Sequence, residues 1–238
     1  MGLQEIADGI WTVPAPLRYM GLQVNTRMTV CRLSDGALAL ISPIAISDEL
    51  RTYIDAIGPL RVLIAPNLLH HLSIGDWIAA YPDALSYMPK GLATKRPDLG
   101  ECDQLGPQFD ENTDVDLQRI PIEGMPKLNE SLFYHRPSKT LITTDFCFYM
   151  PHSKGLTRFS MALMGVHKEV KCDALFRMMI QDKLAFRRSL VPLRSLSIDH
   201  LTMCHHQVVA DDAEMAIQKI LDQLGVPQDK PFLPQDAT

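Results

Sequence analysis

Histidine and carboxylate side chains follow three apolar runs of the sequence, at the points where each run is predicted to end as a strand. They are His70 with His71, Asp145, and His205 with His206. Polar residues just beyond the end of a buried strand are where α/β proteins usually place ligands and chemistry. Two or three imidazoles with one carboxylate suit zinc or iron, because neutral nitrogen and anionic oxygen both fit a borderline metal. The sequence therefore predicts a metal site, with His206 expected to lie outside it.

Each of these residues also has an ordinary structural interpretation. His70 and His71 can be loop histidines that bond to the backbone, and Asp145 can cap a turn or a helix. His205 can be a core histidine with its hydrogen bonds satisfied. Cys204 beside His205 could suggest a thiol nucleophile, but no base is identifiable and a packed small residue is the simpler interpretation. The metal hypothesis rests on the combination of these residues and their order.

The composition is that of a soluble globular protein. The chain has 238 residues, of which 46% are hydrophobic and 21% charged, and layered α/β folds commonly reach this size as one domain with a substantial core. We therefore expect a single domain over residues 1–238, with roughly the last ten residues loosely held. Neither a GxGxxG after a strand nor a GxxxxGK[ST] is present, so nucleotide-loop functions get little support.

The net charge, the cysteines and the apolar segments indicate which kinds of partner and which compartment to expect. Lys and Arg number 23 against 28 Asp and Glu, which gives a net charge of −5. This argues against a general nucleic-acid or anionic-membrane surface, although a local basic patch remains possible. The five cysteines are scattered and never spaced as CxxC, so reduced thiols are expected. No signal peptide and no membrane span are recognisable, which predicts a cytoplasmic protein acting on a small molecule.

Hydrophobic periodicity predicts the elements that position these residues. A hairpin is expected over 23–41, and a helix from its cap at Ser47 to Gly58, with Leu50, Tyr53, Ile54 and Ile57 on the buried face. The remaining elements are predicted strands at 62–65, 84–87, 117–122, 131–135, 140–146 and 197–204, and helices at 75–80, 171–190 and 213–224. Residues 88–116 and 150–170 give no clear pattern. The order is typical of an α/β protein with two sheets between helices.

The order of these motifs resembles the metallo-β-lactamase-like fold. That family has a strand ending in HxHxDH, then a Gly-His, a strand ending in Gly-Asp and a strand ending in Gly-His. Laid on residues 66–71, HxHxDH puts Pro66 and Leu68 at its first two histidines, His70 at its aspartate and His71 at its third histidine. The Gly-His becomes Gly124-Met125, and the last two motifs become Thr144-Asp145 and Cys204-His205.

The resemblance implies a four-layer αββα sandwich and a reduced metal site. In the family, the first two histidines and the Gly-His histidine hold one metal, and the Asp-His pair, the shared aspartate and the last histidine hold the other. Under this alignment the first site is lost. His70, His71, Asp145 and His205 would form the second, as a mononuclear site for one Zn or Fe ion.

Two functions follow from that resemblance. In the first, the protein is a metal-dependent hydrolase of an unknown ester, lactone or amide, in which Asp145 ligates the metal or orients the attacking water. Three histidines with one acid would leave an open position only if coordination exceeds four or one residue does not ligate. In the second, the protein is a catalytically inactive, metal-free member of the fold that serves as a binding or scaffold protein.

Overall fold

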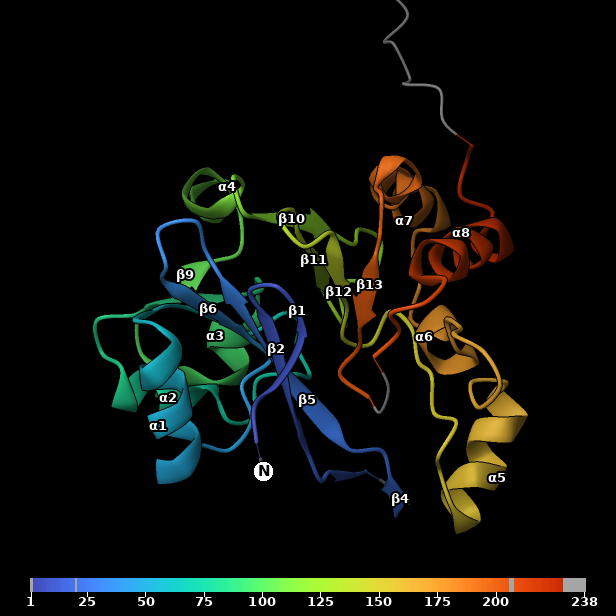
Figure 1. The fold of residues 1–238 in the computed structure, drawn as a ribbon. Coiled ribbons are helices and arrows are strands. Elements are labelled where there is room, and N and C mark those ends of the chain that lie inside the picture. Colours follow the sequence, from blue (N-terminus) through green and yellow to red (C-terminus); the bar gives the residue numbers. More distant parts are fainter. Residues whose placement is uncertain (1, 20, 206–207, 229–238) are drawn as a thin grey trace, which may run out of the picture.

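The computed structural model describes residues 2–19, 21–205 and 208–228, and it arranges them as two sheets packed face to face between layers of helices (Figure 1). The larger sheet has seven strands in the order β1-β2-β5-β6-β7-β8-β9, and the smaller has the order β10-β11-β12-β13. The predicted α/β fold with a four-layer αββα architecture is therefore confirmed.

The larger sheet comes from the first half of the chain. Its strands are β1 (Gln4–Ala7), β2 (Ile10–Ala15), β5 (Thr26–Arg32), β6 (Leu38–Ile41), β7 (Leu60–Ile64), β8 (Leu85–Met88) and β9 (Asp103–Gln104). The strands from β1 to β6 pair antiparallel, and those from β6 to β9 pair parallel. A small hairpin of β3 (Arg18–Tyr19) and β4 (Leu22–Gln23) extends from one end of this sheet.

The smaller sheet joins β10 (Leu117–Pro121), β11 (Ser131–His135), β12 (Thr140–Ile142) and β13 (His200–Thr202). The first three strands are antiparallel, and β12 pairs parallel with β13. The prediction for 131–135 matches β11, whereas the strands predicted at 140–146 and 197–204 are much shorter. Both end early because the chain turns away to form the loops that carry Asp145 and His205.

Helices cover the outer face of each sheet. The larger sheet is covered by α1 (Asp48–Ile57), α2 (Ile74–Ala80) and α3 (Leu92–Lys95), followed by η1 (Pro97–Leu99). The smaller sheet is covered by α6 (Ala174–Met178), α7 (Lys183–Ser189), η2 (Val191–Ser195) and α8 (Ala213–Leu224). Two further helices, α4 (Pro107–Thr113) and α5 (Gly155–Met164), lie at opposite ends of the molecule (Figure 1).

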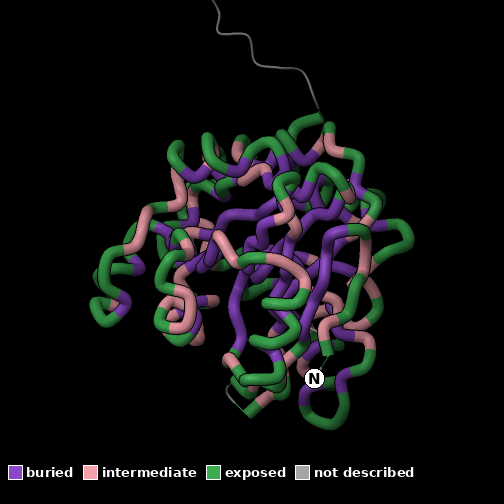
Figure 2. The backbone as a smooth tube through the Cα atoms, turned by 60° about the vertical axis from the view of Figure 1, so that its left-hand side comes forward, coloured by how far each residue is buried: buried purple, intermediate pink, exposed green. Residues whose placement is uncertain are grey.

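Side chains alternate between the two faces of each strand, and this produces three apolar interfaces. In β6, Leu38 and Leu40 pack toward the helices that cover the larger sheet, while Ala39 and Ile41 face the opposite sheet. In β11, Phe133 faces the larger sheet and Leu132 packs toward the helices of the other outer layer. This period of two is what a sheet buried on both faces requires. Figure 2 shows buried residues running through the middle of the molecule and exposed ones on its outer helices and loops.

Three details differ from the sequence prediction. The helix expected at 171–190 is two helices, because the Asp182 carboxylate accepts from Leu184 and Ala185 N–H and starts α7 afresh. Tyr53 was placed on the buried face of α1, but it is 42% exposed. The unreadable stretches 88–116 and 150–170 contain the short elements α3, η1, β9 and α4, and the helix α5. Among the described residues, no helix is long and apolar enough to cross a membrane.

Candidate metal centre

Strand ends from both sheets meet at one end of the sandwich and bring His70, Asp145 and His205 together. His70 lies in the loop after β7 of the larger sheet, and Asp145 and His205 follow β12 and β13 of the smaller one. The parallel pairing of β12 with β13 joins Ile142 to Thr202. Asp145 and His205 each lie three residues beyond that pair, so the register of the sheet itself places them side by side.

The three side chains converge on one oxygen atom. Nε2 of His70 and Nε2 of His205 each lie 3.4 Å from Oδ1 of Asp145. Their potential ligand atoms all lie within 4.8 Å of one another, and no other such group of His, Cys, Asp and Glu occurs in the described part of the chain. Ligands at about 2.0–2.1 Å from a tetrahedral zinc are themselves separated by about 3.3 Å. The cluster could therefore hold one metal ion.

Hydrogen bonds on the far side of each imidazole fix its orientation. Nδ1 of His205 lies 2.8 Å from the backbone oxygen of Asn25, which can only accept, so Nδ1 carries the proton. Nε2 is then the nitrogen that faces Asp145. Nδ1 of His70 bonds to the Ser42 hydroxyl at 3.0 Å. The ring of Phe148 stacks on His205 with centroids 5.2 Å apart and holds its plane.

Asn67, which the sequence analysis did not single out, holds both Asp145 and the His70 loop. Its Nδ2 donates to Oδ2 of Asp145 at 2.8 Å and to the Thr144 hydroxyl at 3.0 Å. Its Oδ1 accepts from the backbone N–H of Leu69 and His70 at 2.8 and 2.7 Å. Asn67 is fully buried. It therefore turns Oδ1 of Asp145 toward the histidines. In the sequence, the only feature that points to Asn67 is its place after Pro66, where an asparagine favours a turn.

Glu130 is a second buried residue that the sequence analysis did not single out. Its carboxylate accepts from the backbone N–H groups of Thr144, Asp145 and Phe146 at 2.9, 3.1 and 3.3 Å, and from the Thr144 hydroxyl at 2.6 Å. These bonds form the turn that presents Asp145. Burial and the nearby Asp145 carboxylate raise the pKa of Glu130 to about 7. A glutamate just before a strand otherwise predicts a solvated side chain, so no local pattern reveals this role.

The charges in the cluster stabilise one another. Burial alone would raise the pKa of Asp145, but the charge of His70 and hydrogen bonds from both histidines lower it instead. Burial alone would lower the pKa of His70, yet Cys204 and Asp145 raise it well above its usual value. The three side chains are only 9–11% exposed, so these interactions act where water screens them little.

The structure does not bring His71, the fourth predicted ligand, into this group. Its Nδ1 lies 3.2 Å from the Arg96 guanidinium, which can only donate, so Nδ1 is the acceptor. Burial, together with the charges of Lys95 and Arg96, lowers the pKa of His71. Adjacent residues in a turn point in different directions, so only one of the two histidines can face Asp145. His71 instead holds the loop against η1.

The remaining predicted positions also have a place in the structure. Met125, aligned with the missing Gly-His histidine, is buried in the apolar layer between the smaller sheet and its helices. The Cys204 thiol donates to the Arg27 backbone oxygen at 3.4 Å, as a packed small residue would. His206, which was expected to lie outside the site, falls outside the described residues.

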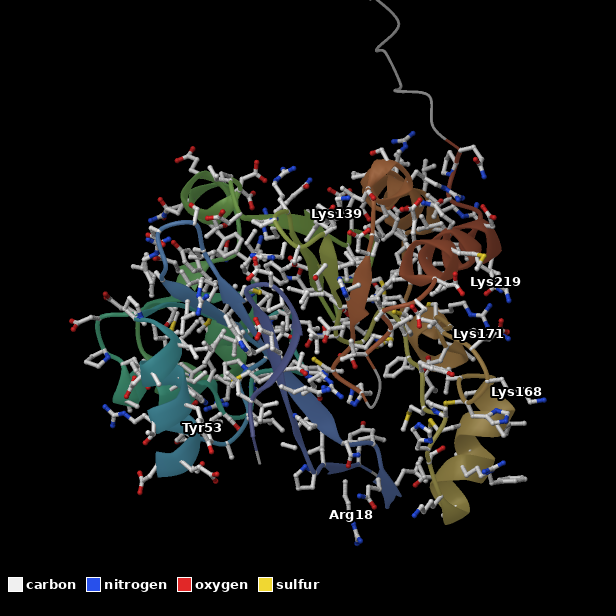
Figure 3. The ribbon with its side chains drawn as sticks, in the orientation of Figure 1. Arg18, Tyr53, Lys139, Lys168, Lys171 and Lys219 are labelled. Carbon is white, nitrogen blue, oxygen red and sulfur yellow. The ribbon has the colours of Figure 1, made fainter. Side chains whose placement is uncertain are left out.

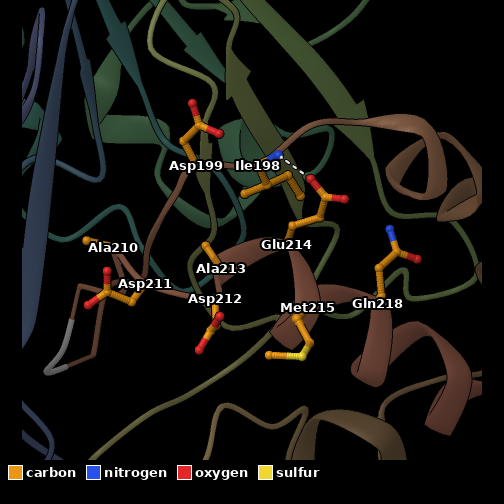
Figure 4. A pocket seen from close by; sticks show the side chains of 9 residues that line it. All are labelled: Ile198, Asp199, Ala210, Asp211, Asp212, Ala213, Glu214, Met215 and Gln218. Carbon is orange, nitrogen blue, oxygen red and sulfur yellow. Dashed lines mark hydrogen bonds between the residues drawn. The ribbon is translucent and has the colours of Figure 1, made fainter.

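Two surface cavities lie away from the cluster. One, of about 650 Å³, lies beside the start of α8 and is lined in part by Asp199, Asp211, Asp212 and Glu214 (Figure 4). Glu214 accepts a hydrogen bond from the Ile198 N–H there. The other, of about 230 Å³, lies along β10 beside Arg188 and Pro192. Neither is lined by a residue of the cluster.

The architecture and the position of this cluster define a metallo-β-lactamase-like fold, and solved structures agree. The metallo-β-lactamase from Pontibacter korlensis superposes with a TM-score of 0.61 at 14% identity, covering 94% of this chain and 98% of that one. The DIM-1 metallo-β-lactamase gives 0.61 at 12% identity, covering 93% and 96%. A putative diflavin flavoprotein A 5 fragment from Nostoc sp. PCC 7120 gives 0.64 at 14% identity, covering 94% and 95%.

The sequence places the chain more narrowly within that fold. Residues 7–157 match the model of a family described as a domain of unknown function, DUF4336. The match covers more than half of the chain, so the protein belongs to this family. No curated protein matches the sequence. The structural likeness, at these low identities, concerns the fold alone.

Proposed function

We propose that this protein binds one Zn²⁺ or Fe²⁺ ion through His70, Asp145 and His205 and is a metal-dependent hydrolase of an ester, lactone or amide. The observation that carries the proposal is the pair of equal 3.4 Å distances from Asp145 Oδ1 to the two Nε2 atoms. They match the separation of ligands around a small divalent ion. The neighbours named metallo-β-lactamases support the hydrolytic part.

The ligand number also favours catalysis over a purely structural role. Four protein ligands would have filled a tetrahedral site, but His71 bonds to Arg96 and leaves three. Catalytic zinc sites typically have three protein ligands and an open position, and two histidines with one carboxylate also suit non-haem iron. When bound, such an ion lowers the pKa of a coordinated water toward neutrality and polarises a carbonyl oxygen.

The residues of the chain would have distinct roles. Asp145 was expected either to ligate the metal or to orient the water. Its Oδ2 is held by Asn67 and its Oδ1 is shared between the histidines, which supports the ligand role. Ser42 and the Asn25 carbonyl hold the outer nitrogens of the two imidazoles. Such outer contacts commonly affect metal affinity by about 10- to 100-fold.

A metal-free binding or scaffold protein is the second candidate, and one observation favours it. The raised pKa of His70 and the lowered pKa of Asp145 describe a buried ion pair that satisfies its own charges. Such a cluster would hold the loops together without any ion. Burying three ionisable groups costs desolvation free energy, and apolar side chains in their place would often make the protein at least as stable. Holding loops together is therefore a weak reason to keep this cluster.

Elemental analysis of protein purified without added metal separates the two candidates. We expect close to one equivalent of zinc or iron in the wild type, and loss of it in Asp145→Asn and His205→Ala. His71→Ala is the matched control, because it removes the adjacent imidazole and should keep the metal. Less than about a tenth of an equivalent in the wild type would favour the metal-free candidate.

Hydrolysis is tested on a panel of chromogenic esters, lactones and amides. The proposal expects turnover that disappears on chelation, returns when the metal is restored and is absent in Asp145→Asn. Turnover that survives chelation with the metal removed would contradict a metal-dependent hydrolase. A metal-loaded protein without turnover on every member of the panel would contradict the proposed substrate classes while leaving the metal assignment intact.

A further inference from the structure

The helix α5 exposes its large apolar side chains instead of burying them. Leu156, Phe159 and Leu163 are 69%, 71% and 84% exposed, and their spacing places them on one face of the helix. Thr157 and Met161, on another face, are buried. A surface helix normally turns its apolar stripe inward. An exposed apolar stripe of this kind marks an interaction site.

Further exposed apolar side chains lie on neighbouring elements. Leu175 and Met178 of α6 are 57% and 80% exposed, and Tyr19 of the β3–β4 hairpin is 66% exposed. The hairpin is joined to α5, because the Gln23 N–H donates to the Thr157 hydroxyl at 3.0 Å. Figure 1 shows β4 and α5 projecting together from the same end of the molecule. A tyrosine beside apolar side chains is typical of a surface that meets the polar boundary of a membrane.

The charge around this stripe is positive, unlike that of the whole chain. No Asp or Glu occurs between Asp145 and Glu169, whereas Lys154, Arg158 and Lys168 are all exposed. Glu169 itself is neutralised, because it pairs with both Lys171 and Lys219. Figure 3 shows Lys168 and Lys171 beside one end of α5, and Arg18 on the β3–β4 hairpin at the same end of the molecule. The net charge of −5 argued against a general anionic-membrane surface but left a local basic patch open.

We propose that the α5 face, defined as Leu156, Phe159 and Leu163 with the flanking Lys154, Arg158 and Lys168, docks on an anionic lipid bilayer. An amphipathic helix with basic residues beside its apolar side chains lies in the plane of the membrane interface and is attracted to anionic headgroups. A second copy of the chain fits less well. A symmetric contact through this face would bring the same basic side chains toward one another.

The helix that carries the docking face is connected to the metal centre through its buried side. Thr157 of α5 bonds to Gln23, and two residues further on the Asn25 carbonyl holds His205. Phe148, which stacks on His205, pairs through its backbone with Lys171, seven residues after the end of α5. The buried side of α5 is therefore connected, through the β3–β4 hairpin, to the loops that form the candidate site. The docking proposal itself does not depend on a bound metal.

Vesicle co-sedimentation tests the proposal with the full-length chain. We expect binding to phosphatidylcholine vesicles that contain phosphatidylglycerol, weaker binding to phosphatidylcholine alone, and release as salt is raised. Lys154→Gln and Arg158→Gln should each weaken binding about fivefold, since a basic residue near an anionic surface contributes about 1 kcal/mol. The double variant F159S/L163S should abolish it. Val115→Ser, on a side chain that is 79% exposed after α4, is the matched control and should bind like the wild type.

A fluorescent variant reports on the position of the face. Trp11 and Trp77 are buried, so Phe159→Trp adds a single exposed indole whose emission should shift to the blue when anionic vesicles are added. The proposal is overturned if the wild type fails to bind anionic vesicles, or if binding ignores lipid charge and salt. It is also overturned if the wild type is a dimer in solution that F159S/L163S converts to a monomer.

Discussion

Asn67 is the residue whose replacement tests the architecture of the site most sharply, because one buried amide makes four hydrogen bonds there. Asn67→Ala removes the donor to Asp145 Oδ2, the donor to Thr144 and the acceptor for two backbone N–H groups. A bond to a charged partner contributes about 1.5–3 kcal/mol and a neutral one about 1 kcal/mol. The sum is about 4.5–6 kcal/mol, a large share of the 5–15 kcal/mol that stabilises a typical domain.

The measurement is thermal and urea unfolding of chelator-treated protein, so that the result does not depend on a metal. For a chain of this size each kcal/mol lowers the midpoint by about 2–4 °C, so we expect a fall of at least about 8 °C. Asn112→Ala is the matched control, since that exposed amide makes one bond, to the Tyr87 hydroxyl at 3.2 Å. A midpoint for Asn67→Ala within about 2 °C of the control would show that Asn67 does not hold the site together.

Three further predictions concern a tightly packed glycine, the cysteines and His70. Gly124→Ala should destabilise the protein by more than about 3 kcal/mol in urea unfolding, because at φ +73° the added Cβ would clash with the Asp182 carbonyl oxygen. Gly36→Ala is the control: with a similar φ and nothing within 4 Å, it should cost only about 1 kcal/mol. In the native protein a thiol reagent should react with Cys102 alone, because the other four cysteines are buried and should react only after unfolding. Fast reaction of a second thiol in the native protein would contradict this. The raised pKa of His70 means that metal binding releases a proton, so zinc affinity measured by chelator competition should rise about tenfold per pH unit through neutrality; an affinity independent of pH would count against His70 as a ligand.

Elements with a clean period and clear ends were predictable from the sequence. The final helix, expected at 213–224, agrees with α8 residue for residue, because its apolar face repeats regularly and Gly225 follows it. Ser47 caps α1 as its position predicted, accepting from the Leu50 N–H. The helix at 171–190 was misjudged because its apolar pattern continues across Asp182, and only the capping bonds of that side chain reveal the break.

The site was only partly predictable, since its geometry depends on pairings far apart in sequence. His70, Asp145 and His205 could be named because each follows a recognisable strand. Which of His70 and His71 faces the centre could not, because the turn made by Asn67 decides it. Glu130 acts on Asp145 across fifteen positions through backbone N–H groups. Such a contact leaves no local pattern.

The exposure of the α5 face could not be predicted from the sequence for a different reason. Its apolar residues repeat as they would in a core helix, but they face outward. Sequence periodicity identifies the faces of a helix without saying which of them the protein covers. Only the packing of Thr157 against the β3–β4 hairpin shows which side is inward.

Anomalous scattering at the metal absorption edge, from crystals of protein purified without chelators, tests the central claim most directly. We expect one peak, bonded at about 2.0–2.2 Å to Nε2 of His70, Nε2 of His205 and Oδ1 of Asp145, with His71 remaining on Arg96. A peak at any other set of residues, or well-ordered His70 and His205 bonded directly to Asp145 with no peak between them, would contradict it.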